Sequence, residues 1–209
     1  MSAFMSPRDR ALLGASPVEP VLHDAPLRPL AAGQRRLVCA ANGLYAEARS
    51  EALHLRCLIG AGATPYGHAD EFVMPAAGPV PLALVSQFVA EARRTPHQEI
   101  AGVIVRDGAG YALRLLGPIS ASGAHVSYND RDVDDDALVI DLHSHGAHAA
   151  VFSSQDDRSD LSRRGPYIAM VVGRCFSERP EIATRLVMPP YLQPATLAGL
   201  KLAGALSCE

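Results

Sequence analysis

Four apolar runs of strand length in the later part of the chain constrain its fold more than any other feature. They start at residues 99, 137, 167 and 181, and turn-forming or charged residues bound each run. Between residues 82 and 94 the apolar residues instead recur at helical spacing, and a second helix is predicted from Ser153 or Ser154 to about Arg164. Strands interrupted by two helices predict an α+β domain, with α-β-α layers around a central mixed sheet.

Local signals place further elements around these runs. Asp107-Gly108 predicts a tight hairpin between the first run and residues 111–116, because such turns need the positive φ that Gly adopts freely. The segment 122–136 is polar and predicts a connection to the next run. The tail 195–206 predicts a short apolar helix.

The first third of the chain has a different pattern. Residues 1–34 hold Pro, Ala and scattered charges without a sustained period, and they predict a loose arm or an extended lead-in. Asn42-Gly43 predicts a hairpin, and residues 52–59 predict a third strand. The Gly- and Pro-rich stretch 60–70 predicts a boundary. We therefore expect an N-terminal arm and small β-rich region over 1–69, and the main domain with its tail over 70–209.

Composition narrows the class of protein. Hydrophobic residues make up 48% of the chain, which predicts a packed core, and the net charge of −3 gives no basic footprint for nucleic acid. No apolar run approaches the roughly 20 residues that span a bilayer. The cysteines form no CxxC pair, which indicates free thiols in a reducing compartment: Cys39, Cys57, Cys175 and Cys208. We expect a soluble cytoplasmic protein that binds neither nucleic acid nor membrane.

The stretch "DLHSHGAHAAVFSSQDD" holds a candidate metal site. His143 and His145 end a predicted strand and are two residues apart, so both side chains leave the same face. Asp156 follows in the first turn of a predicted helix. Two histidines and a carboxylate with an open fourth position are a ligand set of catalytic zinc. A His-x-His pair alone is a weak signal, and Ser153-x-x-Asp156 is also typical of a capping box, so both interpretations stay open.

The full spacing adds an upstream acid to this site. It resembles the JAMM motif of the MPN+/Mov34 (JAB-type) zinc metalloprotease family, in which a Glu-led strand precedes H-[ST]-H, seven residues and S-x-x-D. The resemblance covers about residues 70–190. Gly146 stands where the family often has Pro, which is expected to alter the loop and not the ligands. The matching positions are Glu99, Gly102, His143, Ser144, His145, Ser153 and Asp156.

The resemblance implies a cytidine-deaminase-like fold and a role for each matching side chain. His143, His145 and Asp156 would hold one Zn²⁺ per chain. Glu99 would be the general base that takes a proton from the attacking water and passes it to the leaving amine. Ser153 would donate a hydrogen bond to the oxyanion. Without the resemblance, a Glu at a strand start is most simply a solvated residue.

Other metal-site families fit the residues less well. "DLHSH" also resembles the first motif of PHP phosphoesterases and of amidohydrolases, but too little chain follows it for their barrels. Ala147 stands where the metallo-β-lactamase pattern needs Asp. His148 remains a possible extra ligand, and His97 and His125 are expected on the surface or lining the cleft.

The resemblance also implies a substrate: a peptide or isopeptide bond at the C-terminus of a ubiquitin-like protein. The acidic segment 130–136 is expected to be a solvated loop, or else to attract a basic tail of such a protein. The N-terminal region before a compact JAMM domain resembles protein A of the PRTRC cassette, which implies an E1/ThiF-like enzyme as a further partner. The alternative is a non-catalytic MPN-type scaffold that binds partner proteins. The apolar tail leaves the oligomeric state open.

Overall fold

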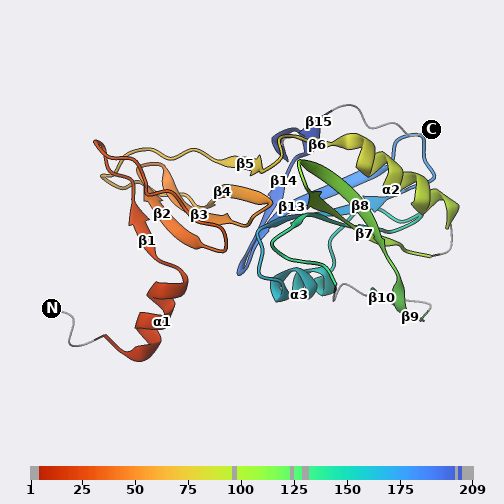
Figure 1. Ribbon diagram of the computed structural model, residues 1–209, viewed down its shortest axis with the longest axis horizontal. Helices are drawn as coiled ribbons and strands as arrows, with labels where there is room; N and C mark the ends of the chain where they lie inside the picture. The colour runs from red at the N-terminus through yellow and green to blue at the C-terminus, as the bar shows by residue number, and fades with distance from the viewer. Residues whose placement is uncertain (1–4, 96–97, 123–124, 129–131, 201, 204–209) are drawn as a thin grey trace.

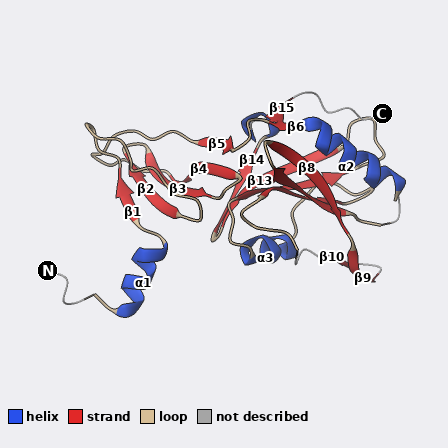
Figure 2. Cartoon of the chain, in the orientation of Figure 1, coloured by secondary structure: helices blue, strands red, loops and turns tan. Residues whose placement is uncertain are grey.

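The computed structural model describes residues 5–95, 98–122, 125–128, 132–200 and 202–203 of the 209-residue chain (Figure 1). The helices are α1 (Pro7–Ala15), α2 (Leu82–Arg94) and α3 (Ser154–Ser162), with a 3-10 turn η1 (Leu197–Leu200). The strands are β1 (Val18–Pro20), β2 (Arg35–Ala40), β3 (Gly43–Arg49), β4 (Leu53–Gly60), β5 (Phe72–Pro75), β6 (Val80–Pro81), β7 (Ala101–Asp107), β8 (Gly110–Leu116), β9 (Pro118–Ser122), β10 (His125–Tyr128), β11 (Leu138–Ser144), β12 (Tyr167–Gly173), β13 (Glu181–Met188), β14 (Tyr191–Ala195) and β15 (Leu202–Ala203). Strands outnumber helices among these elements (Figure 2).

The N-terminal sheet has the strand order β1-β2-β3-β4-β5. The predicted hairpin at Asn42-Gly43 is confirmed, since β2 and β3 pair antiparallel up to the Ala40–Gly43 pair. Gly43 has a φ of +142°, and a Cβ there would lie 2.5 Å from the Leu58 side chain, so no other residue fits. Strand β5 pairs with β4 and carries this sheet to Pro75, beyond residue 69 where the division was predicted.

The expectation of a loose arm or an extended lead-in over residues 1–34 included no helix, but residues 7–15 form α1, and the extended β1 pairs with β2. Ser6 caps α1 by accepting a hydrogen bond from the Asp9 backbone N–H, and Pro7 stands at the first helical position. The helix has no apolar stripe and no buried residue, which is why periodicity missed it. The capping residue and the proline were the usable signals.

The central sheet is mixed and has the order β14-β13-β12-β11-β7-β8. Strands β11 and β12 run parallel, and the other neighbours are antiparallel. The predicted hairpin at Asp107-Gly108 joins β7 to β8 as expected. Two predictions were incomplete here. The segment 122–136, expected to be a polar connection, contains β10, which forms a hairpin with the preceding β9. The short helix expected in the tail is limited, among the described residues, to the 3-10 turn η1, which is followed by β15.

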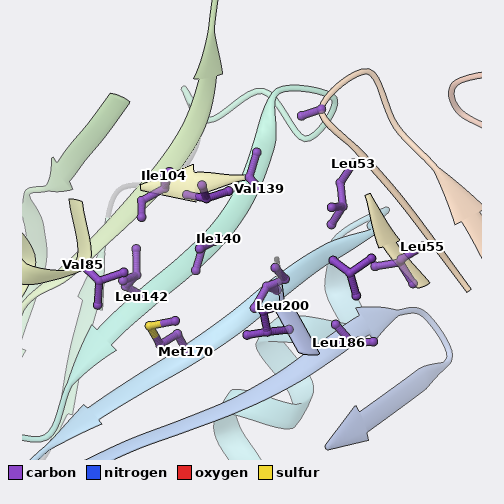
Figure 3. Close-up of a cluster of buried hydrophobic side chains, with 14 of the residues drawn as sticks. Leu53, Leu55, Val85, Ile104, Val139, Ile140, Leu142, Met170, Leu186 and Leu200 are labelled. Carbon is purple, nitrogen blue, oxygen red and sulfur yellow. The ribbon is translucent and has the colours of Figure 1, made fainter. Parts of the chain in front are cut away.

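One cluster of buried apolar side chains runs from the N-terminal sheet through α2 to the central sheet (Figure 3). It includes Leu53 and Leu55 of β4, Phe88 of α2, and Ile140 and Leu142 of β11, each fully buried. Burial of this apolar area is the main term that stabilises the fold. The N-terminal sheet and the central sheet therefore share a core.

The two faces of the central sheet carry different helices. Side chains of one face, such as Ile140 and Leu142, pack with α2 in the large cluster. The opposite face has its own smaller cluster, with Tyr167 and Val187 packed against Phe152 just before α3. Among the described residues, no helix combines the length and apolar character needed to cross a bilayer.

Candidate metal centre

The structure brings His143, His145 and Asp156 together. One possible ligand atom from each lies within 4.8 Å of the other two. His143 is the penultimate residue of β11, His145 follows its end, and Asp156 stands in the first turn of α3. The two imidazole rings have centroids 5.1 Å apart. The end of β11 and the first turn of α3 therefore bring these side chains together on the face of the central sheet that carries α3.

His143 is poised as a neutral ligand. Burial lowers its pKa to about 4, assisted by the nearby His145 and Arg185 charges and opposed by Asp156. Its Nε2 is buried and has no hydrogen-bond partner among the described residues, and it faces Oδ1 of Asp156 at 3.5 Å. A buried nitrogen without a partner is costly unless something binds its lone pair. A metal ion would satisfy it.

The two carboxylate oxygens of Asp156 have different roles, one in capping helix α3 and the other in the candidate metal site. Oδ2 accepts a hydrogen bond from the backbone N–H of Ser153, while the Ser153 hydroxyl accepts from the Asp156 backbone N–H at 3.3 Å. This is the capping box, and Oδ1 is the oxygen that faces His143. Burial tends to raise the pKa of Asp156, but the Ser153 hydrogen bonds and the neighbouring histidines outweigh it and lower that pKa. Capping box and ligand geometry therefore coexist.

His145 is oriented by the loop that follows it. Its Nδ1 lies 3.0 Å from the carbonyl oxygen of Ala149, which can only accept, so Nδ1 carries the proton and Nε2 keeps its lone pair. The loop is pressed onto β12: a Cβ on Gly173 would lie 2.2 Å from the Ala150 nitrogen and 2.6 Å from the His148 carbonyl oxygen. Only glycine at 173 allows this approach.

These donors fit zinc. Two imidazole nitrogens with free lone pairs and one carboxylate oxygen are the three-ligand set of a catalytic site, which leaves a fourth position for water or substrate. The otherwise unpartnered Nε2 of His143 is the observation in favour of an ion. JAMM-type domains bind zinc, and the spacing of this cluster matches theirs.

Glu99 and Ser153, the two residues expected to act on the substrate, lie outside the cluster of possible ligands. Glu99 is exposed and precedes β7, whose Ala101 pairs with His143. Two hydrogen bonds hold this end in place: Ser144 N–H donates to the Ile100 carbonyl, and Ile100 N–H donates to Ser144 Oγ. The chain at Glu99 therefore runs beside the end of β11. Ser153 is exposed at the start of α3.

The remaining candidate residues have other surroundings. His148 is exposed and is not part of the ligand cluster found in the described part of the chain. His97 lies outside the described residues, as does the side chain of His125. In the acidic segment, Asp135 is not simply solvated: its carboxylate pairs with Arg163 at 3.0 Å. Asp130 lies outside the described residues.

A cluster next to the site was not predicted from the sequence. Arg185 of β13 donates to Asp157 and Asp160 of α3, and its guanidinium lies 3.9 Å from the centre of the Phe152 ring. Tyr167 donates its hydroxyl hydrogen bond to Asp160 at 2.9 Å. We call these five residues the Arg185 cluster. The only signal of this cluster in the sequence is an arginine within an apolar strand, and that signal does not indicate which residues the arginine contacts.

Comparison with known proteins agrees with this geometry. Residues 81–187 match the family described as prokaryotic homologs of the JAB domain, and residues 6–74 match a domain of unknown function, DUF2016. No curated protein matches the chain.

Among solved structures, a protein of Desulfitobacterium hafniense determined in solution is similar, with 20% identity and a TM-score of 0.44. The match covers 56% of this chain and 88% of that chain. The family match spans about half of the 209 residues and contains the whole His-His-Asp cluster. The predicted JAMM/MPN relationship is confirmed, and the chain belongs to the prokaryotic JAB-domain family.

Proposed function

We propose that this protein is a zinc-dependent peptidase or isopeptidase that hydrolyses a bond at the C-terminus of a ubiquitin-like protein. The observation that carries the proposal is the His143, His145 and Asp156 cluster, with its unpartnered buried Nε2 and a pKa for His143 of about 4. At neutral pH His143 and Asp156 are therefore deprotonated and can bind a cation. The JAB family includes metallopeptidases, which supports the reaction class.

Each residue of the site has a distinct part in this proposal. Bound zinc lowers the pKa of a water molecule to about 7 and polarises a carbonyl group. Glu99 takes the proton of the attacking water and delivers it to the leaving amine. Glu99 is exposed just before β7, next to Ile100, which is hydrogen-bonded to Ser144, so its carboxylate is accessible to substrate. No other described carboxylate matches that place in the family motif.

Ser153 supports the developing negative charge. Its hydroxyl oxygen already accepts hydrogen bonds from the backbone N–H groups of Gln155 and Asp156, both at 3.3 Å. A hydroxyl has only one hydrogen to donate, and these two contacts do not use it. In the free protein a hydrogen bond from the Ser153 side chain helps to lower the pKa of Asp156, so Ser153 would turn this hydrogen from Asp156 to the oxyanion when substrate binds. The capped helix start also favours negative charge there.

The substrate class follows from the family resemblance. We propose a ubiquitin-like protein or its conjugate, an E1/ThiF-like enzyme in the same pathway, and a place in the cytoplasm of a bacterium. The narrower proposal is a component of the PRTRC cassette, with the DUF2016 region as its second part. The expected relation to cytidine-deaminase-like α-β-α folds belongs to the same proposal.

The first test is zinc content. We expect about one zinc per chain by elemental analysis after gel filtration, and almost none for His143→Ala. The purified protein is then incubated with ubiquitin-like proteins carrying C-terminal extensions or isopeptide-linked lysines. Glu99→Gln is the matched control, because it should keep the zinc and abolish hydrolysis. Full hydrolysis by Glu99→Gln overturns the mechanism, and a zinc-free wild type favours the non-catalytic scaffold.

A further inference from the structure

The helix that carries Asp156 has almost no apolar support. Among the nine residues of α3, Asp160 is the only buried one, and the single leucine, Leu161, is 41% exposed. A helix of this length is not stable alone, and helices in proteins are normally held by an apolar face. Something other than hydrophobic packing must fix α3 against the sheet.

Arg185 supplies that attachment. Its Nε donates to Asp160 Oδ2 at 2.7 Å, and its Nη1 donates to Asp157 Oδ1. The two aspartates are three residues apart, so they lie on one side of the helix. One planar guanidinium thus donates hydrogen bonds to two aspartates about one helical turn apart in α3. A lysine cannot reproduce this, because its ammonium is a single point of charge.

The same guanidinium also holds the chain before the helix. It lies 3.9 Å from the ring centre of Phe152, the residue that precedes the capping Ser153. Asp156 therefore lies between two points, Phe152 and Asp157, that both contact Arg185. The arginine itself is 7% exposed and belongs to β13, a strand hydrogen-bonded on both sides. The strand that carries Arg185 is therefore held on both of its edges.

We infer that Arg185 is a positioning residue for the metal centre, fixing the first turn of α3 so that Asp156 faces His143 and Ser153 faces the substrate. The inference rests on the proposed function and names a residue outside the JAMM motif. Partners outside the ligand shell typically change metal affinity by 10- to 100-fold when removed.

The test measures zinc affinity on the full metal-free chain, by competition for Zn²⁺ with a chromophoric chelator. We expect Arg185→Met to bind zinc 10- to 100-fold more weakly than the wild type, and Arg185→Lys to fall between them. Arg36→Lys is the matched control: Arg36 is 5% exposed and also donates to two carboxylates, Glu19 and Glu47, but in the N-terminal sheet. It should lose thermal stability and keep wild-type zinc affinity.

Two further measurements keep the test decisive if Arg185→Met does not fold. Asp157 has a side chain 49% exposed, so Asp157→Asn removes one contact of the cluster with little risk to folding, and it should weaken zinc binding several-fold. Amide hydrogen exchange of residues 153–162 should be faster in Arg185→Lys than in the wild type, with β11 unchanged. Zinc affinity equal to wild type in Arg185→Lys and Asp157→Asn overturns the inference, whereas a wild type without zinc overturns the proposed function itself.

Discussion

The N-terminal sheet and the central sheet each bury a cluster of ionised side chains, and the two clusters are built around opposite charges. In the first, Glu47 is 2% exposed and is surrounded by Arg36, His54 and Arg56, all within 3.1 Å of its oxygens. We call these four residues the Glu47 cluster. In the Arg185 cluster, the buried cation Arg185 instead donates hydrogen bonds to two acids, Asp157 and Asp160. The Glu47 cluster lies entirely within hydrogen-bonded strands, while the Arg185 cluster joins a strand to a helix.

The surroundings give the two buried acids opposite pKa shifts. Burial tends to raise the pKa of Glu47, but the His54 hydrogen bond and the Arg56 and Arg36 charges outweigh it and lower that pKa to about 2. Burial raises the pKa of Asp160, because Arg185 and Tyr167 only partly compensate it. The comparison teaches that similar chemistry stabilises strands in one place and positions a functional helix in the other.

The largest expected effect comes from Glu47→Gln, which leaves the buried Arg36 and the partly buried Arg56 without their shared acid. Breaking a buried ion pair by removing one partner costs about 3–5 kcal/mol of the free energy of unfolding. Urea denaturation at pH 7 measures it. Zinc affinity of the folded fraction should stay within twofold of the wild type. A tenfold loss of zinc affinity would contradict the separation of the two clusters.

Acidification should remove the Glu47 contribution by itself. The pKa of Glu47 is lower in the folded than in the unfolded state, so its stabilisation is complete above about pH 4.5 and is lost as the pH falls toward 2. The shift corresponds to about 3 kcal/mol. Urea midpoints between pH 5 and 3 should fall more steeply for the wild type than for Glu47→Gln. Parallel profiles would refute the assignment.

Asp160→Asn should cost less stability than Glu47→Gln but should affect the metal centre. Asparagine keeps one acceptor for Tyr167 and Arg185 while losing the charge, and hydrogen bonds to charged groups contribute about 1.5–3 kcal/mol. Because the pKa of Asp160 is raised in the folded state, its removal should slightly steepen the loss of stability on acidification. Chelator competition should detect weaker zinc binding, and unchanged binding would leave Asp157 and Phe152 as the effective contacts of Arg185.

The smallest expected effect on stability is that of Ser153→Ala, which removes the cap of α3. Loss of an N-cap side chain costs about 1 kcal/mol. Hydrolysis should nevertheless fall by about 10²–10³-fold if Ser153 donates to the oxyanion. Stability from urea titration and turnover of the extended ubiquitin-like substrate are compared in one preparation. A loss of stability of about 1 kcal/mol without the large fall in turnover would assign Ser153 a capping role alone.

The sequence predicted α2 and α3 by different signals. The predicted stripe was Leu84, Val85, Phe88, Val89 and Ala92, and all of these except the half-buried Leu84 are buried. Helix α3 has no such stripe, and its start was predicted from the Ser153-x-x-Asp156 cap, while its end falls at Ser162, before the predicted Arg164. Apolar periodicity and capping are both local signals, so one sequence is enough to read them.

What the sequence did not predict depends on contacts between distant residues. The His-His-Asp positions came from a motif of fixed spacing, but the partners of Arg185 stand 25 and 28 residues before it, and no period connects them. The arm before β1 had no apolar pattern, so only the cap at Ser6 could have indicated α1. Strand β14 was not predicted because it is short and contains Pro194.

The apolar cluster that runs from the N-terminal sheet into the central sheet has a consequence for how the chain gains its structure. Residues matched by two separate families contribute to it, among them Leu53 and Leu55 on one side and Leu142 and Leu186 on the other. Each set of side chains would be exposed to water if the other were removed. The two matched regions of this chain therefore meet in one shared core, and unfolding of the N-terminal sheet would expose apolar side chains of the domain that holds the candidate metal site.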